Sequence, residues 1–152
     1  MTRARTLLHL GGAEFQVPAI ECAKRLGCTV ITADNRPENP GHRLADRYVN
    51  VSTVDREAVL AVAREHAVDA VMTFGSDVAA PTVCFVADAL GLPGNPLSAA
   101  EVLQRKDLFR AFQQRVGLPH PPFVVTSDAA EAVAAFAALE APVIVKPADS
   151  SG

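Results

Sequence analysis

The stretch Thr6-Leu-Leu-His-Leu-Gly-Gly-Ala-Glu-Phe-Gln16 decides the fold. An apolar run typical of a buried strand ends at Gly11 and Gly12, and a helical pattern follows from about residue 15 to residue 27. A strand that enters a helix through a glycine turn is the first half of a strand–helix–strand unit. The rest of the chain repeats this alternation.

Short runs rich in Val, Ile and Leu predict strands that are buried on both faces of a sheet. They lie at residues 6–10, 29–33, 48–51, 70–74, 123–125 and 143–146. Helical stretches separate them, at about 15–27, 55–66, 77–91, 99–116 and 128–140. Regular alternation of this kind predicts an α/β fold with a parallel sheet flanked by helices.

Composition narrows the class of protein. The 152 residues are 49% hydrophobic, which favours a folded core over disorder, and no apolar stretch is long enough to span a membrane. The formal net charge of −3 argues against a nucleic-acid partner. Three cysteines without metal-ligand spacing indicate a reduced, soluble, cytoplasmic protein.

The stiff turn Gly-Leu-Pro-His-Pro-Pro at residues 117–122 marks a domain junction. We expect a first domain at 1–97, a linker helix and hinge at 98–122, and a second piece at 123–152. That last piece holds one strand–helix–strand unit, which is too small to bury a core by itself. The pattern therefore predicts that the native chain continues beyond Gly152.

Candidate ligand residues follow the first, second and fourth predicted strands, whose carboxyl ends share one edge of a parallel sheet. Glycines and a helix N-terminus let the backbone approach a ligand, and an acid at this distance from the glycines can hold a ribose. The full G-x-G-x-x-G pattern is absent, so an ordinary strand–helix turn stays open, as does simple helix capping by the Ser and Asp. These candidates are Gly11, Gly12, Glu14, Gln16, Asp34, Gly75, Ser76 and Asp77.

Two lysines stand out from the other charged residues. Lys106 falls on the apolar stripe of the predicted helix 99–116, where it either snorkels or meets an anion. Lys146 ends a hydrophobic strand and precedes a small-residue loop that finishes in Ser150, Ser151 and Gly152. A fixed lysine beside loop amides suits a phosphate, although an exposed lysine before a turn is the simpler interpretation.

Several segments, in order, resemble the ATP-grasp superfamily in its carbamoyl-phosphate synthase and biotin carboxylase branch. They are LHLGGAEFQVPAIECAKRLGCTVITAD, PENPGHRLADRYVNVSTVDREAVLAVA, VDAVMTFGSDVAAPTVCFVADALGLPG, SAAEVLQRKDLFRAFQQRVGLPHPP and EAPVIVKPADSSG. The resemblance implies a Rossmann-like pre-ATP-grasp domain, a linker helix, and the first half of the ATP-grasp lid.

The resemblance also implies roles for the candidate residues. Lys106, Lys146 and the loop residues Ser150, Ser151 and Gly152 would bind ATP, and the candidates at the sheet edge would bind the acceptor substrate. ATP and Mg²⁺ are the implied cofactors. The adenine site and the Mg²⁺ ligands would lie beyond Gly152, so no catalytic residue and no metal ligand is assigned in this chain, and the fragment alone is expected to be inactive.

The function implied by the resemblance is that of an ATP-dependent carboxylate–amine ligase that forms an acyl phosphate. Its partners would be small carboxylates and amines, with no nucleic acid and no membrane. One alternative is a non-catalytic Rossmann-like module that binds a nucleotide or a small acid. Another is an interaction fragment whose open sheet edge pairs with a second copy, giving a homodimer.

Overall fold

The computed structural model describes residues 3–139 and 142–149. Among them lies one four-stranded parallel sheet, with strand order β3-β2-β1-β4. The strands are β1 (Thr6–Leu10), β2 (Thr29–Asp34), β3 (Arg47–Asn50) and β4 (Ala70–Thr73). The predicted parallel α/β sheet is confirmed.

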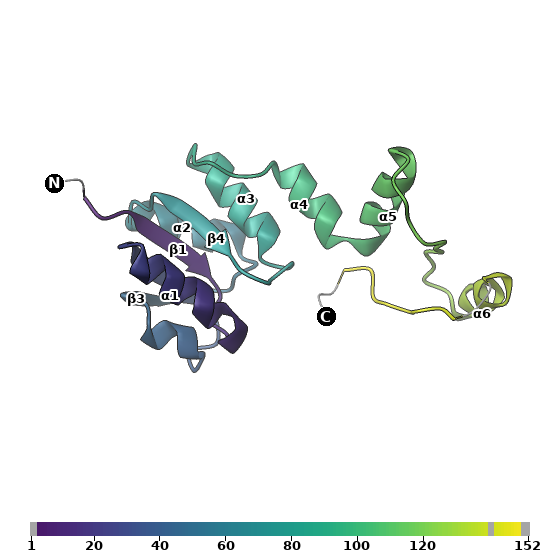
Figure 1. Cartoon of the computed structure of the whole chain (residues 1–152), viewed down its shortest axis with the longest axis horizontal. Helices are drawn as coiled ribbons and strands as arrows, with labels where there is room; N and C mark the ends of the chain where they lie inside the picture. The colour runs from purple at the N-terminus through teal and green to yellow at the C-terminus, as the bar shows by residue number, and fades with distance from the viewer. Residues whose placement is uncertain (1–2, 140–141, 150–152) are drawn as a thin grey trace. The chain divides into compact units, whose positions relative to one another are not determined.

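The helices alternate with the strands in the first part of the chain and follow one another in the second (Figure 1). The α-helices are α1 (Val17–Arg25), α2 (Arg56–Glu65), α3 (Ala80–Ala89), α4 (Leu97–Gln104), α5 (Lys106–Arg115) and α6 (Ala129–Ala138). Two short 3-10 helices are η1 (Glu14–Gln16) and η2 (Pro40–Arg43). Helices α2 and α6 begin where the sequence provides a cap, because the carboxylates of Asp55 and Asp128 accept amides at the third helical residue.

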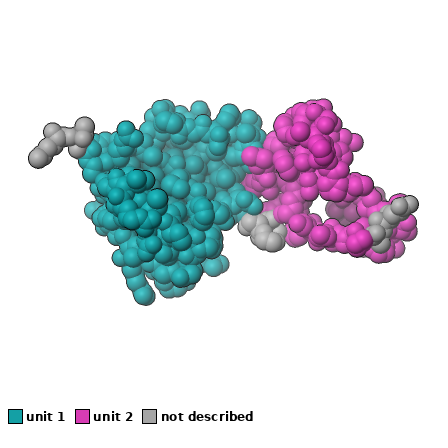
Figure 2. Space-filling view, viewed as in Figure 1, with its two compact units in different colours: residues 1–101, 151 teal, residues 102–150, 152 magenta. Residues whose placement is uncertain are grey.

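The described residues form two compact units, one up to Glu101 and one from Val102 onward (Figure 2). Unit 1 contains the whole sheet with α1, α2 and α3. Unit 2 contains α5, α6 and the segments around them. The division falls inside the segment 98–122 that the sequence marks as a linker.

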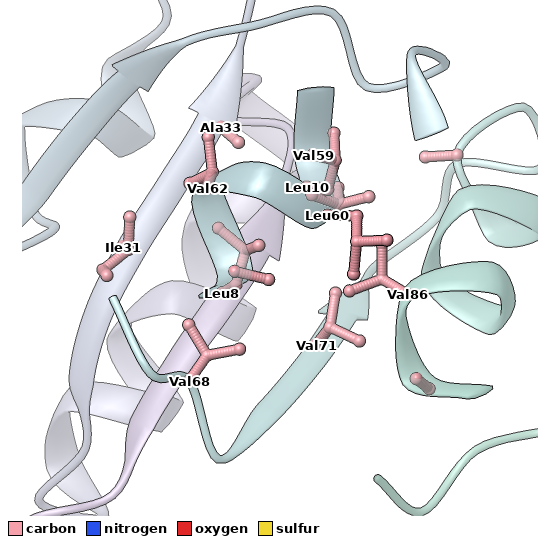
Figure 3. Close-up of a cluster of buried hydrophobic side chains, with 13 residues drawn as sticks. Leu8, Leu10, Ile31, Ala33, Val59, Leu60, Val62, Val68, Val71 and Val86 are labelled. Carbon is pink, nitrogen blue, oxygen red and sulfur yellow. The ribbon is translucent and has the colours of Figure 1, made fainter. Parts of the chain in front are cut away.

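The core of unit 1 follows from the alternation of side chains along β1. Leu8 and Leu10 point to the face covered by α2 and α3, where they pack in a cluster with Val59, Leu60 and Val86 (Figure 3). Leu7 points to the opposite face, which α1 covers (Figure 1). A sheet with helices on both faces has apolar residues at nearly every position of its central strands.

One helix was predicted over residues 99–116, and the structure has two. Arg105 has extended backbone angles (φ −91°, ψ 115°) and separates α4 from α5. The Lys106 amide donates to the Ala148 carbonyl at 2.9 Å instead of to a carbonyl of the preceding turn. A contact distant in sequence thus ends α4, so Lys106 is the first residue of α5 and does not continue the apolar stripe of α4.

The predicted strands at 123–125 and 143–146 are also not formed. Neither segment pairs with another strand among the described residues, and Val124, Ile144 and Val145 are exposed. A strand needs a hydrogen-bonded neighbour, and apolar composition cannot supply one. The strand–helix–strand unit of unit 2 is therefore present here as α6 (Ala129–Ala138) between two unpaired segments.

Within the described residues, no helix has both the length and the apolar character needed to cross a bilayer.

The core assignment gives a direct test. Leu8 is completely buried, so Leu8→Ala should lower the free energy of unfolding by about 2–5 kcal/mol, as other large-to-small core changes do. Urea denaturation followed by circular dichroism measures the change. Leu26→Ala is the matched control, because Leu26 is 78% exposed and should shift stability by less than about 0.5 kcal/mol. Equal effects of the two changes would contradict the packing in Figure 3.

Candidate functional site

Three loops meet at the carboxyl edge of the sheet. Residues 11–16 follow β1, residues 35–39 follow β2, and residues 74–77 follow β4. Because β2, β1 and β4 are neighbours in that order, the structure brings together the candidates that the sequence predicted for this edge. The loops differ in what they bury and what they leave exposed.

The Asp34 side chain holds two loops of this edge together. Its carboxylate is buried and accepts hydrogen bonds from the amides of Gly12 (3.1 Å) and Arg36 (3.0 Å). The side-chain amide of Asn39 donates to the same carboxylate at 2.9 Å. Three internal donors thus hold this side chain in one orientation and tie the β1 loop to the β2 loop.

Gln16 connects the β1 loop to the β4 loop. Its side-chain amide donates to the carbonyls of Leu10 (3.2 Å) and Phe74 (3.1 Å), and its oxygen accepts the amide of Ala13 (3.0 Å). The side chain is only 2% exposed. It therefore bonds to backbone groups on two neighbouring strand ends, and the Leu10 carbonyl also accepts the Thr73 hydroxyl at 2.9 Å.

The two glycines of the β1 loop are needed for close packing. Gly11 has a φ of +97°, a conformation that side chains strongly disfavour. A β-carbon at Gly12 would overlap the imidazole of His42. The Gly12 carbonyl also accepts the amide of Gly41 at 2.8 Å, so the loop before η2 lies directly against this turn.

The His42 side chain packs against the glycine turn that follows β1. Its Nδ1 lies 2.9 Å from the Thr32 hydroxyl, and its Nε2 lies 3.1 Å from the Arg36 carbonyl. A carbonyl oxygen only accepts, so Nε2 carries a hydrogen. Tyr48 packs against the imidazole with ring centroids 4.1 Å apart and donates its hydroxyl to the Asp34 carbonyl at 2.9 Å.

The remaining candidates at this edge are more open. Glu14, Gly75 and Asp77 are exposed and Ser76 is partly buried. The predicted capping of α3 by Ser76 or Asp77 is wrong. Helix α3 begins at Ala80, later than the pattern indicated, and its N-cap residue Ala79 offers no side-chain oxygen.

His9 is a buried titratable group beside the same edge. Its Nδ1 lies 2.9 Å from the Gly11 carbonyl, which makes Nδ1 the donor, and its buried Nε2 has no hydrogen-bond partner. Burial lowers the pKa of His9, and the hydrogen bond to Gly11 opposes that shift. The imidazole is therefore a neutral core side chain at neutral pH.

The two candidate lysines both belong to unit 2. Lys106 is partly buried at the start of α5, and Lys146 is exposed. The backbone amide of Lys106 donates to the carbonyl of Ala148, which lies two residues beyond Lys146. The preceding Arg105 forms a two-point ion pair with Asp107, at 2.9 and 2.7 Å. The backbone thus brings the segments of the two lysines together. Ser150, Ser151 and Gly152 lie outside the described residues.

No cluster of three His, Cys, Asp or Glu side chains that could hold a metal ion occurs in the described part of the chain.

Comparison with known proteins identifies the fold family. Residues 20–94 match the ATP-grasp N-terminal domain family. Residues 20–94 therefore form an ATP-grasp N-terminal domain. The chain is 33% identical, over 96% of its own length and 37% of the relative's, to the formate-dependent phosphoribosylglycinamide formyltransferase of Synechococcus sp. strain RCC307.

Two solved structures share the fold of this chain. The L-amino acid ligase of Bacillus licheniformis is 28% identical, with a TM-score of 0.74 over 99% of this chain and 39% of that one. A biotin carboxylase domain from Hydrogenobacter thermophilus, crystallised with MgADP and bicarbonate, superposes with a TM-score of 0.74 over all of this chain and 36% of that one, at 18% identity. The chain thus spans 37% of the length of the curated relatives it matches.

Sequence reasoning missed the groups that support the Asp34 loop. Asn39, His42 and Tyr48 were not singled out as candidate residues, although all three support this loop. The segment between β2 and β3 contains one histidine, His42, and nothing in the sequence indicates that its side chain is buried. Sequence reasoning also missed Phe15 and Phe74, which adjoin predicted site residues.

The role of Gln16 can be tested by one atom change. Gln16→Glu replaces the donating amide nitrogen with an oxygen, so the Leu10 and Phe74 carbonyls would face a carboxylate. We expect the free energy of unfolding to fall by about 3 kcal/mol, the range for buried polar groups that lose partners. Glu14→Gln, the reverse change at an exposed position of η1, is the control and should be nearly neutral. If Gln16→Glu is as stable as wild type in thermal denaturation, the Gln16 side chain does not link the Leu10 and Phe74 carbonyls as described.

His9 predicts a pH dependence of stability. Its folded-state pKa lies below the ordinary value of 6.5, so the unfolded chain takes up the proton first as pH falls. The contribution of His9 is complete above pH 6.5 and is lost as pH falls through the lower folded-state pKa. His9→Asn keeps a donor for the Gly11 carbonyl but does not titrate. In urea titrations at a series of pH values, wild type should lose more stability below pH 6.5 than this variant, and parallel curves would contradict the assignment.

Proposed function

We propose that this chain supplies the N-terminal domain and linker of an ATP-dependent carboxylate–amine ligase. The observation that carries the proposal is the 2.9 Å hydrogen bond from the Lys106 amide to the Ala148 carbonyl. It joins the two segments that hold candidate phosphate-binding lysines. The 33% identity to a formyltransferase and the 28% identity to an amino acid ligase, each over nearly the whole chain, support the same class of chemistry.

The proposed reaction has two steps. A carboxylate oxygen attacks the γ-phosphorus of ATP, so that ADP leaves and an acyl phosphate forms. An amine nitrogen then attacks the acyl carbon, the carbon–oxygen bond to phosphate breaks, and the nitrogen loses a proton to water. Phosphorylation is needed because a carboxylate oxygen is a poor leaving group, whereas inorganic phosphate is a good one.

In this mechanism Lys106 and Lys146 act as positioning cations. Each ammonium donates to phosphate oxygens and offsets negative charge as the phosphoryl group is transferred. Neither lysine acts as a general acid or base in this mechanism. Amides of the loop that ends in Ser150, Ser151 and Gly152 are proposed to wrap the same phosphates.

The carboxyl edge of the sheet in unit 1 is the proposed acceptor site. Asp34 and Gln16 serve it by fixing the loops, because their polar atoms already have internal partners. Gly11 and Gly12 give the turn its close packing. Glu14, Gly75, Ser76 and Asp77 are the candidates left at the surface to meet a substrate.

We assign Mg²⁺, which would accompany ATP and shield its phosphates, to no residue of this chain. A cytoplasmic location and a homodimer are further parts of the proposal.

Removing the charge of Lys146 tests the ATP assignment. In the protein as its gene encodes it, Lys146→Met should raise the KM for ATP about 10- to 100-fold, since a hydrogen bond to a charged group is worth about 1.5–3 kcal/mol. Lys106→Met should act in the same direction. Steady-state ADP release measures both changes.

The third lysine of the chain is a matched control. Lys24 lies on unit 1 and pairs with Asp46 at the surface, so Lys24→Met should leave the KM for ATP unchanged. If Lys146→Met and Lys24→Met have the same kinetics, Lys146 does not bind ATP. If the wild-type protein releases no ADP with any carboxylate and amine pair, the ligase proposal itself is wrong.

A further inference from the structure

Two aromatic side chains lie exposed where β1 and β4 end side by side. Phe15 belongs to η1 and is 54% exposed, and Phe74 directly follows β4 and is 50% exposed. Large rings usually lose most of their exposure on folding, and two at one sheet edge indicate a surface that binds something.

Both rings stand on fixed backbone. The Gln16 side chain, next to Phe15, donates to the Phe74 carbonyl at 3.1 Å. Gly75 has a φ of +62°, and a β-carbon there would lie 3.2 Å from Cδ2 and Cε2 of Phe15. The ring of Phe15 therefore lies over the Gly75 backbone, and its exposed side is presented in a defined position.

The two segments that carry the rings have charged residues of one sign only. Exposed carboxylates at Glu14 and Asp77 flank the aromatic positions, and no lysine or arginine occurs in residues 6–16 or 70–77. Arg36 is the nearest basic residue in the edge loops, but it follows β2, which lies on the other side of β1 from β4. Within these two segments, a phosphate beside Phe15 and Phe74 would thus meet carboxylates and no cation.

We propose that Phe15, Phe74, Glu14 and Asp77 bind the amine substrate, and that this amine carries an apolar or aromatic group and no phosphate. The inference rests on the proposed function and narrows its substrate class. The ammonium is attracted by the carboxylates and by the faces of the rings, and the apolar body packs on the rings. Among the relatives, this chemistry matches an amino acid ligase better than an enzyme for a phosphoribosyl compound.

Binding of simple amines by the 152-residue chain, with no ATP present, tests the site. The probes are 2-phenylethylamine and O-phosphoethanolamine, which share an aminoethyl group and differ in the apolar or phosphate end. Amide chemical shifts in two-dimensional NMR report where each probe binds. We expect 2-phenylethylamine to shift the amides of residues 13–16 and 74–77, and O-phosphoethanolamine to leave them unchanged.

Variants assign the contacts. Phe15→Ala and Phe74→Ala should each raise the Kd for 2-phenylethylamine about fivefold, the effect of losing about 1 kcal/mol of cation–π attraction. Glu14→Gln should also weaken binding of 2-phenylethylamine, whereas Arg36→Ala and Leu26→Ala should leave its Kd unchanged. Because the aromatic side chains are half exposed, both alanine variants should keep the fold, and unchanged shifts of amides far from the site would verify it.

Three results would overturn the inference. They are no shift with 2-phenylethylamine, shifts that persist unchanged in Phe15→Ala and Phe74→Ala, or tighter binding of O-phosphoethanolamine that Arg36→Ala abolishes. None of these measurements involves ATP. The ligase proposal can therefore fail, through absent ADP release, while the amine site stands, and the reverse outcome is equally distinguishable.

Discussion

The Asp34 carboxylate accepts three hydrogen bonds from two loops, and the rest of the carboxyl edge depends on it. It lies at the end of β2, where burial would be costly for a charge without partners. The Gly12 amide, the Arg36 amide and the Asn39 side chain supply those partners. In return, the turn after β1 and the loop after β2 are held in one arrangement, and Gly41 and His42 can pack against the glycines.

This arrangement separates the groups that build the site from those that can meet a ligand. Asp34 and Gln16 are buried and bonded internally, so a substrate gains from them through the positions of the loops. Phe15, Glu14 and Phe74 carry the exposed chemistry on the same loops. A rigid base lowers the entropy cost of binding, because the exposed side chains are already placed before the ligand arrives.

The sequence predicted the sheet and its edge because both depend on short-range patterns. Apolar runs, glycine turns and helical periodicity predicted all four strands of unit 1 and placed Gly11, Asp34 and Gly75 at one edge. The break at Arg105 was missed because its cause, the Ala148 carbonyl, lies far away in sequence. The start of α3 was misplaced for a different reason, since Ser76 and Asp77 have good capping side chains that the helix does not use.

The apolar segments of unit 2 show the same limit from the other side. Residues 143–146 have the composition of a buried strand, yet Ile144 and Val145 are 81% and 91% exposed. Composition reports what a segment can become when a neighbour covers it, and the neighbour itself is a property of the fold. The sequence at Lys146 therefore predicts a chemical role, that of a cation before a small-residue loop, which does not depend on the segment forming a strand here. The hydrogen bond between Lys106 and Ala148 affects both local structure and the proposed chemistry. It separates α4 from α5, and it joins the two segments that carry the candidate lysines.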